Sequence, residues 1–270
     1  MITLLSDFGA QDAYVAVMKG VIATIAPNVK TCDLTHEIPP QNILAARFNL
    51  TMAYPYFPVG TVHLAVVDPG VGSARLGVAV QFSKGFFVGP NNGLFGGLLP
   101  EASLVSAVSL TNPQYWRASR VSQTFHGRDI FAPVAAHLAN GVAIEALGDR
   151  IDPATLIQPN IVPIAQLRQS PAAYVGSLQY IDRFGNLISN IPAERVPKTP
   201  WQVTIEDAIA DSPQRPQRPI PGRSTYSDVP TGALVSLAGS HGWIEIACNG
   251  GNAAQILSAT PGLRVVLESL

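Results

Sequence analysis

The hydrophobic pattern of this chain changes near residue 155, and this change constrains the fold more than any other feature. Before that point, strand-like apolar runs alternate with segments of helical spacing; the runs are residues 1–5, 61–67, 76–82 and 86–88. After it, short apolar runs follow one another without a long helical pattern between them. Alternating strands and helices are typical of a mostly parallel sheet, whereas consecutive short strands are typical of a sandwich or barrel. The sequence therefore predicts two architectures in series.

We predict an α/β domain with a mostly parallel sheet over residues 1–155, a linker over residues 156–170 and a smaller, barrel-like all-β domain over residues 171–270. A length of 270 residues suits two domains of this size. Three helices are expected in the first domain: one after Asp12, which is placed to cap it, and two at residues 42–54 and 128–140. Six strands are expected in the second, at residues 173–181, 187–191, 201–205, 234–237, 243–247 and 263–267, with an exposed loop at 211–221.

Charge and hydropathy limit the partners of the chain. Charged residues make up only 13% of it and the formal net charge is -1, so no basic face is expected to bind nucleic acid. No apolar run approaches the roughly 20 residues that a membrane-spanning helix needs, and the first residues lack the cationic region of a signal peptide. Cys32 and Cys248 are far apart and have no metal-like spacing, which favours reduced thiols and a cytoplasmic protein.

Two turns about fifty residues apart carry the side chains best suited to chemistry. Asp68 follows the apolar run at residues 61–67 and opens a loop that reaches Arg75, and His126 lies three residues before Asp129. A carboxylate, a permanent cation and an imidazole can together orient and activate a water molecule. Each residue also has a structural interpretation: Asp68 as a turn cap, Arg75 as a surface charge, His126 as a structural histidine and Asp129 as a helix cap.

A metal site is not expected in this chain. The sequence contains no His-x-x-x-His, His-x-Asp or paired-carboxylate pattern, and Arg75 would repel a dication placed near Asp68. The residues that could serve as metal ligands are Asp68, His126, Asp129, His36 and His63.

In a parallel sheet, ligands gather at the carboxyl ends of strands, where we expect both Asp7 and Asp68.

Six separated motifs connect the chain to a known family. They are residues 6–9 (Ser-Asp-Phe-Gly), 68–75, 89–94, 125–129, 182–186 and 239–249. Taken in this order, they resemble the S-adenosyl-L-methionine hydroxide adenosyltransferase family, which is related to the bacterial fluorinating and chlorinating enzymes. The resemblance covers essentially the whole chain.

The resemblance implies an enzyme, a hydrolase that cleaves S-adenosyl-L-methionine (SAM) to adenosine and L-methionine by attack of water or hydroxide on the ribose C5′. A sulfonium is already a good leaving group, so neither a metal nor a cofactor is expected. By this resemblance Asp68, Arg75 and His126 hold the water. Arg75 would favour hydroxide character, His126 would accept or relay a proton, and Asp68 would orient the water or the ribose.

The resemblance also implies a set of substrate-binding residues. Asp7 matches the carboxylate that holds the ribose hydroxyls, Asp182 the acid that faces the methionine ammonium, and Asn186 an amide that contacts adenine. Ser240 matches a position that holds the methionine carboxylate, while His241 stands where the halogenating relatives have arginine. Carboxylates and amides suit these partners because they accept, or accept and donate, hydrogen bonds.

Three further matched residues have competing structural interpretations. Asp12 lies in the segment that lines the methionine end, or it caps a helix. Phe184 stacks near the substrate, or it belongs to the core. Glu245 faces the ligand from its strand, or it is structural.

Two departures from the halogenating relatives favour water as the nucleophile. Those enzymes have a hydroxyl where Gly127 stands and an aromatic residue in place of Asp68, and a carboxylate would oppose a desolvated halide. The alternatives are a non-catalytic sensor that binds SAM or adenosine, and a halide-using SAM-dependent halogenase. The resemblance further implies a homotrimer with its sites at subunit interfaces.

Overall fold

The computed structural model describes residues 1–96, 104–161, 163–166, 173–206 and 219–270. The chain divides into two compact units, Met1–Asn160 and Ile161–Leu270. Most of the loop expected at residues 211–221 lies outside the described residues, and its last two residues form a short strand.

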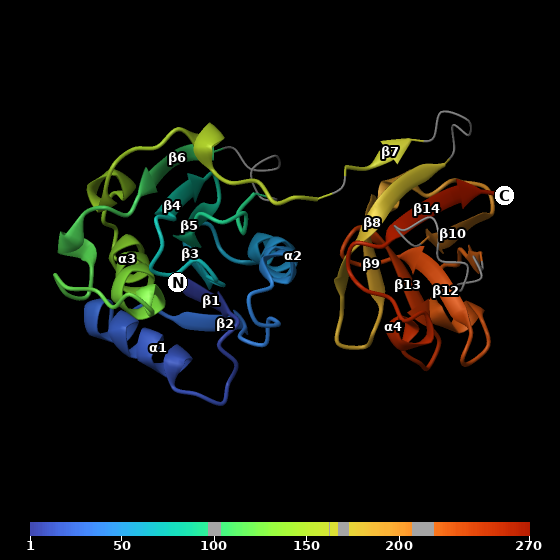
Figure 1. Ribbon diagram of the computed structural model, residues 1–270, viewed down its shortest axis with the longest axis horizontal. Coiled ribbons are helices and arrows are strands. Elements are labelled where there is room, and N and C mark those ends of the chain that lie inside the picture. The colour runs from blue at the N-terminus through green and yellow to red at the C-terminus, as the bar shows by residue number, and fades with distance from the viewer. Residues whose placement is uncertain (97–103, 162, 167–172, 207–218) are drawn as a thin grey trace. The chain divides into compact units, whose positions relative to one another are not determined.

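A six-stranded sheet forms the centre of the first unit (Figure 1), with the order β2-β1-β3-β5-β4-β6. The strands are β1 (Ile2–Ser6), β2 (Thr31–Thr35), β3 (Thr61–Val66), β4 (Gly77–Phe82), β5 (Gly85–Pro90) and β6 (Leu104–Ser109). Pairs β1–β2, β1–β3 and β3–β5 are parallel. Strand β4 runs antiparallel to β5 because only two residues join them, which permits a hairpin but no crossover. The predicted α/β architecture with a mostly parallel sheet is confirmed.

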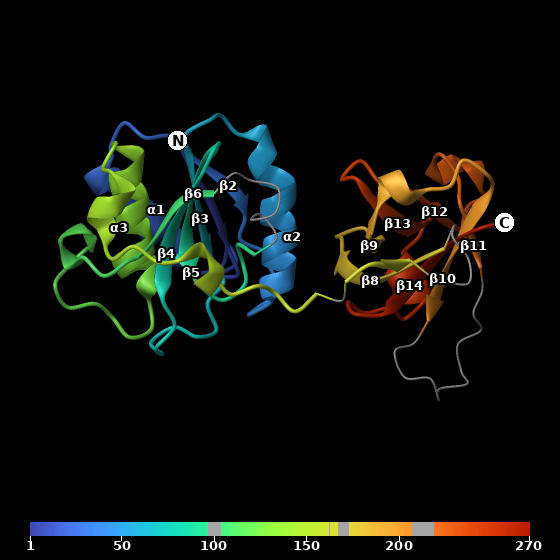
Figure 2. The same ribbon diagram turned by 90° about the horizontal axis from the view of Figure 1, so that it is seen from above.

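Helices α1 (Tyr14–Ile25) and α3 (Ala132–Ala139) cover one face of this sheet, and α2 (Ile43–Ala53) covers the other (Figure 2). The core on the α1–α3 side includes Met18 and Ile22, which are almost fully buried. Short helical turns complete the chain: Tyr54–Tyr56, Pro113–Tyr115, the π-helical turn Gly127–Phe131, Ile144–Leu147 and Pro153–Thr155, and in the second unit Ala193–Arg195 and Tyr226–Asp228. Both faces of the sheet are therefore covered, which explains the continuous apolar run of β3.

The helix starts agree with the sequence at one place and differ at two. Asn42 caps α2, because its side chain accepts a hydrogen bond from the Ala45 N–H at 3.0 Å. Helix α1 begins after Ala13 without a side-chain cap, so the capping role expected for Asp12 is wrong: this residue lies one position too early. The helix expected at residues 128–140 begins instead as a π-helical turn, and the carboxylate of Asp129 makes other contacts.

Strands β1 and β3 are joined by a side-chain hydrogen bond as well as by their backbone pairing. Thr3 lies directly opposite His63, and the Thr3 hydroxyl is 2.8 Å from His63 Nδ1. Both residues are buried, and the His63 ring stacks on Phe87 with 5.1 Å between centroids. Burial lowers the pKa of His63 to about 4, so the ring is neutral at physiological pH.

The second unit is a nearly closed antiparallel barrel, as the sequence predicts. Its strands follow the order β11-β10-β14-β8-β9-β13-β12, with β7 paired to β8. They are β7 (Ala165–Gln166), β8 (Tyr174–Ile181), β9 (Leu187–Pro192), β10 (Trp201–Glu206), β11 (Ile220–Pro221), β12 (Leu234–Ala238), β13 (Trp243–Cys248) and β14 (Arg264–Ser269). A bridge between Gly222 and Ser236 brings the two ends of the sheet together, and the short helix α4 (Ala253–Ile256) packs beside β13.

Candidate active site

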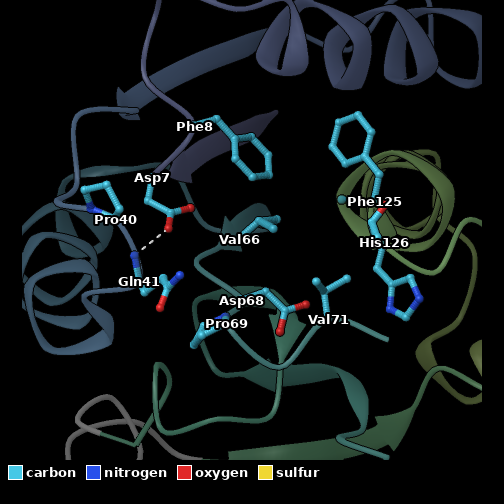
Figure 3. A pocket seen from close by; sticks show the side chains of 12 residues that line it. Asp7, Phe8, Pro40, Gln41, Val66, Asp68, Pro69, Val71, Phe125 and His126 are labelled. Carbon is cyan, nitrogen blue, oxygen red and sulfur yellow. Dashed lines mark hydrogen bonds between the residues drawn. The ribbon is translucent and has the colours of Figure 1, made fainter. Parts of the chain in front are cut away.

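A cavity of about 310 Å³ lies at the carboxyl ends of β1 and β3 (Figure 3). Asp7 directly follows β1 and Asp68 follows β3 by two residues, and the pairing of Ser6 with Val66 brings both to one edge of the sheet. His126 lines the same cavity from the segment that precedes α3. The volume is at the lower end of the range for ligand pockets, which is about 300–1,000 Å³. The edge position expected for Asp7 and Asp68 is the one observed.

Asp68, Arg75 and His126 form a continuous hydrogen-bonded chain. The Arg75 Nε donates to Asp68 Oδ1 at 2.9 Å, and one terminal nitrogen of Arg75 contacts both Asp68 Oδ2 and His126 Nδ1, the latter at 2.8 Å. The side chains of Arg75 and Asp68 are only 11% and 6% exposed, so Arg75 is not a surface charge. The guanidinium also lies 5.2 Å from the centre of the Phe131 ring. Two loops fifty residues apart are thus joined through one cation.

The contact with Arg75 fixes the protonation of the His126 ring. A guanidinium can only donate hydrogen bonds, so Nδ1 must accept, and the neutral ring carries its proton on Nε2. Burial lowers the pKa of His126, and the Arg75 charge lowers it further, while the charges of Asp68 and Asp129 act in the opposite direction. The imidazole is therefore a neutral ring that can donate from Nε2–H, while its Nδ1 already accepts from Arg75.

Asp7 is held by a strained neighbour on the cavity wall. Its Oδ2 accepts a hydrogen bond from the Gln41 N–H at 2.8 Å, and Figure 3 shows both side chains at the cavity. Gln41 has φ of 64°, a left-handed conformation that costs a non-glycine residue roughly 1–2 kcal/mol. The contact uses one oxygen of Asp7, which leaves lone pairs that can accept from ligand hydroxyls.

The wall opposite Asp7 is aromatic and closely packed. Phe125 meets Phe8 and Tyr14 edge to face, with centroids 5.7 and 5.3 Å apart. A Cβ placed on the buried Gly127 would lie 3.1 Å from the Met18 sulfur and 3.2 Å from the Phe125 ring. A side chain at position 127 would therefore have to displace one of these neighbours.

In the second unit, Asp182 and Asn186 are joined within the turn between β8 and β9. Asp182 Oδ1 accepts from the backbone N–H groups of Phe184 and Asn186 at 2.9 and 2.8 Å, and its Oδ2 accepts from the Asn186 side-chain amide at 3.0 Å. Gly185 has φ of 83°, which this tight turn requires. Phe184 is 75% exposed, so its interpretation as a core residue is wrong.

Glu245 is buried in β13 and both of its oxygens have partners. The Tyr226 hydroxyl donates to Oε1 at 2.7 Å, and His241 Nε2 lies 3.0 Å from Oε2. Burial raises the pKa of Tyr226 to about 12, together with the hydrogen bond to Glu245 and the charges of Glu245 and Asp182. Ser240, beside His241, is exposed. Glu245 therefore organises the tyrosine and the histidine around it.

Two other features, a metal-binding cluster and a membrane-spanning helix, are absent from the described residues. No group of three or more His, Cys, Asp or Glu side chains in this part of the chain is arranged to hold a metal ion. Likewise, none of the helices in these ranges combines the length and hydropathy needed to cross a membrane.

Family models account for most of the sequence. The SAM hydroxide adenosyltransferase N-terminal domain matches residues 2–148, and the corresponding C-terminal domain matches residues 176–266. The chain belongs to the SAM hydroxide adenosyltransferase family. The resemblance expected from the six motifs is thus confirmed.

Individual relatives of this SAM hydroxide adenosyltransferase family member agree over nearly full length. An (R)-S-adenosyl-L-methionine hydrolase from Thermus thermophilus is 39% identical, covering 97% of each chain. The crystal structure of an uncharacterized conserved protein from Thermotoga maritima has a TM-score of 0.88 at 33% identity, covering 99% of this chain and 100% of the other. A fluorinase from Nocardia brasiliensis is more distant, 25% identical over 99% of this chain and 96% of its own.

The structure adds residues to which the sequence assigned no role, and it places Asp12 outside the cavity. Gln41 and Phe8 line the cavity and Tyr226 holds Glu245, yet none was assigned a role from sequence. Only the pair of prolines before Gln41 hints at an unusual backbone there. Asp12 is exposed and is not among the residues that line the cavity.

Proposed function

We propose that this protein hydrolyses SAM to adenosine and L-methionine by attack of water on the ribose C5′. The observation that carries the proposal is the Asp68–Arg75–His126 chain, two members of which, Asp68 and His126, line the same cavity as Asp7 in a member of this family. The named relative acts on the (R) form, and we extend that preference to this chain.

The reaction balances without any group beyond substrate and water. An oxygen lone pair of water forms the C5′–O bond while the C5′–S bond breaks, and the bonding electrons remain on sulfur as the neutral thioether of methionine. One water proton leaves toward Asp68, which keeps lone pairs that Arg75 does not use, and passes to solvent. Holding water in line with the C5′–S bond supplies the larger part of the rate.

His126 has a narrower role in this proposal than a free base would have. With Nδ1 engaged by Arg75, the ring offers Nε2–H to the water oxygen and fixes the direction of its lone pairs. Arg75 holds Asp68 and His126 at a set separation and favours partial negative charge on the attacking oxygen.

Substrate binding is assigned to both sets of polar residues. Asp7 would accept from the ribose hydroxyls with the oxygen that Gln41 leaves open. In the second unit, Asp182 would face the methionine ammonium, Asn186 the adenine edge and Ser240 the methionine carboxylate. For Phe184 we propose stacking, since its exposed ring has no core to join. Asp12 and Glu245 are proposed to act at a distance, Glu245 through Tyr226 and His241.

We extend the proposal to the oligomeric state and the cellular location of the protein. We propose a homotrimer with sites at subunit interfaces, as the family resemblance implies. The water-handling residues and the adenine and methionine contacts fall in different units of the chain, which fits this assembly and equally fits a contact within one chain. Light scattering on the purified protein measures this directly. Cys32 and Cys248 are both free thiols, which fits a reducing cytoplasm.

Incubation with each sulfonium epimer of SAM, followed by chromatography, tests the reaction. We expect adenosine and methionine in equal amounts from the (R) epimer, unchanged turnover after treatment with EDTA, and loss of turnover in Asp68→Ala. Tight binding without product would favour a sensor and contradict the hydrolase. A 5′-halo nucleoside formed in chloride or fluoride would show a halogenase instead.

A further inference from the structure

Asp129 is a fully buried carboxylate that accepts four hydrogen bonds, two on each oxygen. Its Oδ1 accepts from Arg117 Nε at 2.6 Å and Arg128 Nε at 2.7 Å, and its Oδ2 accepts from a second Arg128 nitrogen at 2.8 Å and from the Ser122 N–H at 2.7 Å. Burial alone would raise the pKa of Asp129, but the hydrogen bonds from Arg128, Arg117 and Ser122 hold it well below its usual range. The side chain is therefore a permanent anion inside the protein, and it does not line the cavity.

These contacts fix the segment that carries the cavity wall. The Arg117 N–H donates to the Asp129 carbonyl at 2.9 Å, and the Asp129 N–H donates to the Phe125 carbonyl at 3.2 Å. The Arg128 guanidinium lies over the Phe125 ring at 5.2 Å. Asp129 thus holds both ends of the stretch from residue 117 to residue 125, and His126 is the next residue.

The same segment touches the loop that carries Arg75. A Cβ on Gly72 would lie 2.5 Å from the Gln123 carbonyl oxygen, so the backbones of the two loops are packed directly on one another. Gly72 also has φ of 77°, which makes glycine the residue suited to that position. Any shift of residues 122–124 would press on the Asp68–Arg75 loop and change the distance from Arg75 to His126.

We propose that Asp129, with Arg117 and Arg128, is the positioning cluster that sets the Arg75–His126 contact and so the geometry of the attacking water. The proposal rests on the hydrolase function proposed above. It assigns to Asp129 a role in the rate of the chemical step and none in holding the substrate. A misplacement of about 1 Å at a reacting group can lower a rate on the order of 10²-fold, which sets the scale of the effect.

The test compares kcat per binding site with substrate affinity in Asp129→Asn. Calorimetry with adenosine gives the dissociation constant and the fraction of binding-competent sites. We expect kcat per site to fall on the order of 10²-fold with an unchanged dissociation constant. A merely structural role would lower the fraction of competent sites and leave kcat per site unchanged.

Milder substitutions at Arg128 and Arg117 keep the test valid if Asp129→Asn does not fold. Arg128→Lys keeps the charge but loses the contact through two nitrogens, so kcat should fall. Arg117→Gln should also lower kcat, and Arg117→Lys, which keeps a single charged donor, should restore most of that loss. Arg120→Gln is the matched control, because Arg120 is exposed in the same segment. Wild-type kcat in Arg128→Lys and Arg117→Gln would overturn the proposal.

A second measurement does not depend on turnover. Nitrogen NMR of the His126 ring should show the proton on Nε2 in the wild type and a mixture of the two neutral forms in Asp129→Asn. An unchanged His126 spectrum in that variant would overturn the proposal even if activity fell. If the wild type shows no turnover while this spectrum changes as expected, the proposed function fails and the positioning cluster stands.

Discussion

The polar clusters of the two units use different donors to hold their carboxylates. In the first unit Asp68 is bound by the guanidinium of Arg75. In the second unit Asp182 is bound by backbone N–H groups and an amide, and Glu245 by a phenol and an imidazole. A cation beside a cavity can stabilise charge that develops on an attacking oxygen, whereas backbone N–H, amide and hydroxyl donors orient a carboxylate without cancelling its charge. The difference supports our proposal of chemistry for the Asp68 cluster and of recognition for the clusters of the second unit.

The largest effect is expected from Arg75→Lys, which tests the role of the guanidinium in the first unit. An ammonium keeps the charge but cannot hold Asp68 at two points and His126 at a third, so we expect kcat to fall about 10²- to 10³-fold. Steady-state kinetics with SAM measures the change. A rate close to wild type would show that charge alone suffices and that the donor geometry is unimportant.

The pH dependence of kcat gives the next largest effect. His126 accepts from Arg75 only while Nδ1 is unprotonated, and burial and Arg75 hold its pKa below 6.5. The rate should therefore be level through neutral pH and begin to fall only below 6.5, approaching tenfold per pH unit. The charged groups that face the ring are Arg75, Asp68 and Asp129. A limb centred above pH 6.5 would contradict a neutral, occupied imidazole.

Asp182→Asn tests the recognition side of the comparison. Loss of the charge should weaken the proposed contact with the methionine ammonium by about 1.5–3 kcal/mol, so KM should rise roughly tenfold or more while kcat changes little. The turn can keep the two backbone hydrogen bonds because an amide oxygen still accepts, whereas the side-chain amide of Asn186 would have to turn its own oxygen toward the new NH2 group. A fall in kcat at constant KM would move Asp182 into the chemical step.

The smallest expected effect concerns the strained residue beside Asp7. Gln41→Gly relieves the left-handed backbone and should raise the free energy of unfolding by up to about 1 kcal/mol, net of the added freedom of the unfolded chain. Gln41→Ala removes the same side chain but keeps the strain, which makes it the matched control. Urea unfolding of both variants separates strain from side-chain contacts, and equal stabilities would show that the strain is negligible.

Most of the fold followed from sequence because hydrophobic period and turn residues act locally. The strands that were expected in both units and the start of α2 at Asn42 follow from such signals, whereas β2 and β6 were not expected. The edge shared by Asp7 and Asp68 was also predictable, since parallel strands end on the same side of a sheet.

Other features depend on contacts that no local pattern records. The role of Asp129 depends on Arg117 and Ser122, which approach it only in the folded chain, so an acid near a helix start was interpreted as a cap. Tyr226, in the helical turn Tyr226–Asp228, reaches Glu245 in β13 in the same way. The position of Asp12 shows the opposite error, in which a good capping residue lies one place outside the helix.

The hydrogen bond between Thr3 and His63 makes the geometry of the cavity depend on pH through a pair of residues that lies outside the cavity. A slip of β1 against β3 by one residue would shift Asp7 by about 3.3 Å and turn it to the other face of the sheet. With a pKa of about 4 in the folded protein against 6.5 in the unfolded chain, His63 withdraws about 3 kcal/mol of stability as the pH falls from 6.5 to 4. Part of any acid inactivation would then come from this buried pair, in addition to the protonation of His126 inside the cavity.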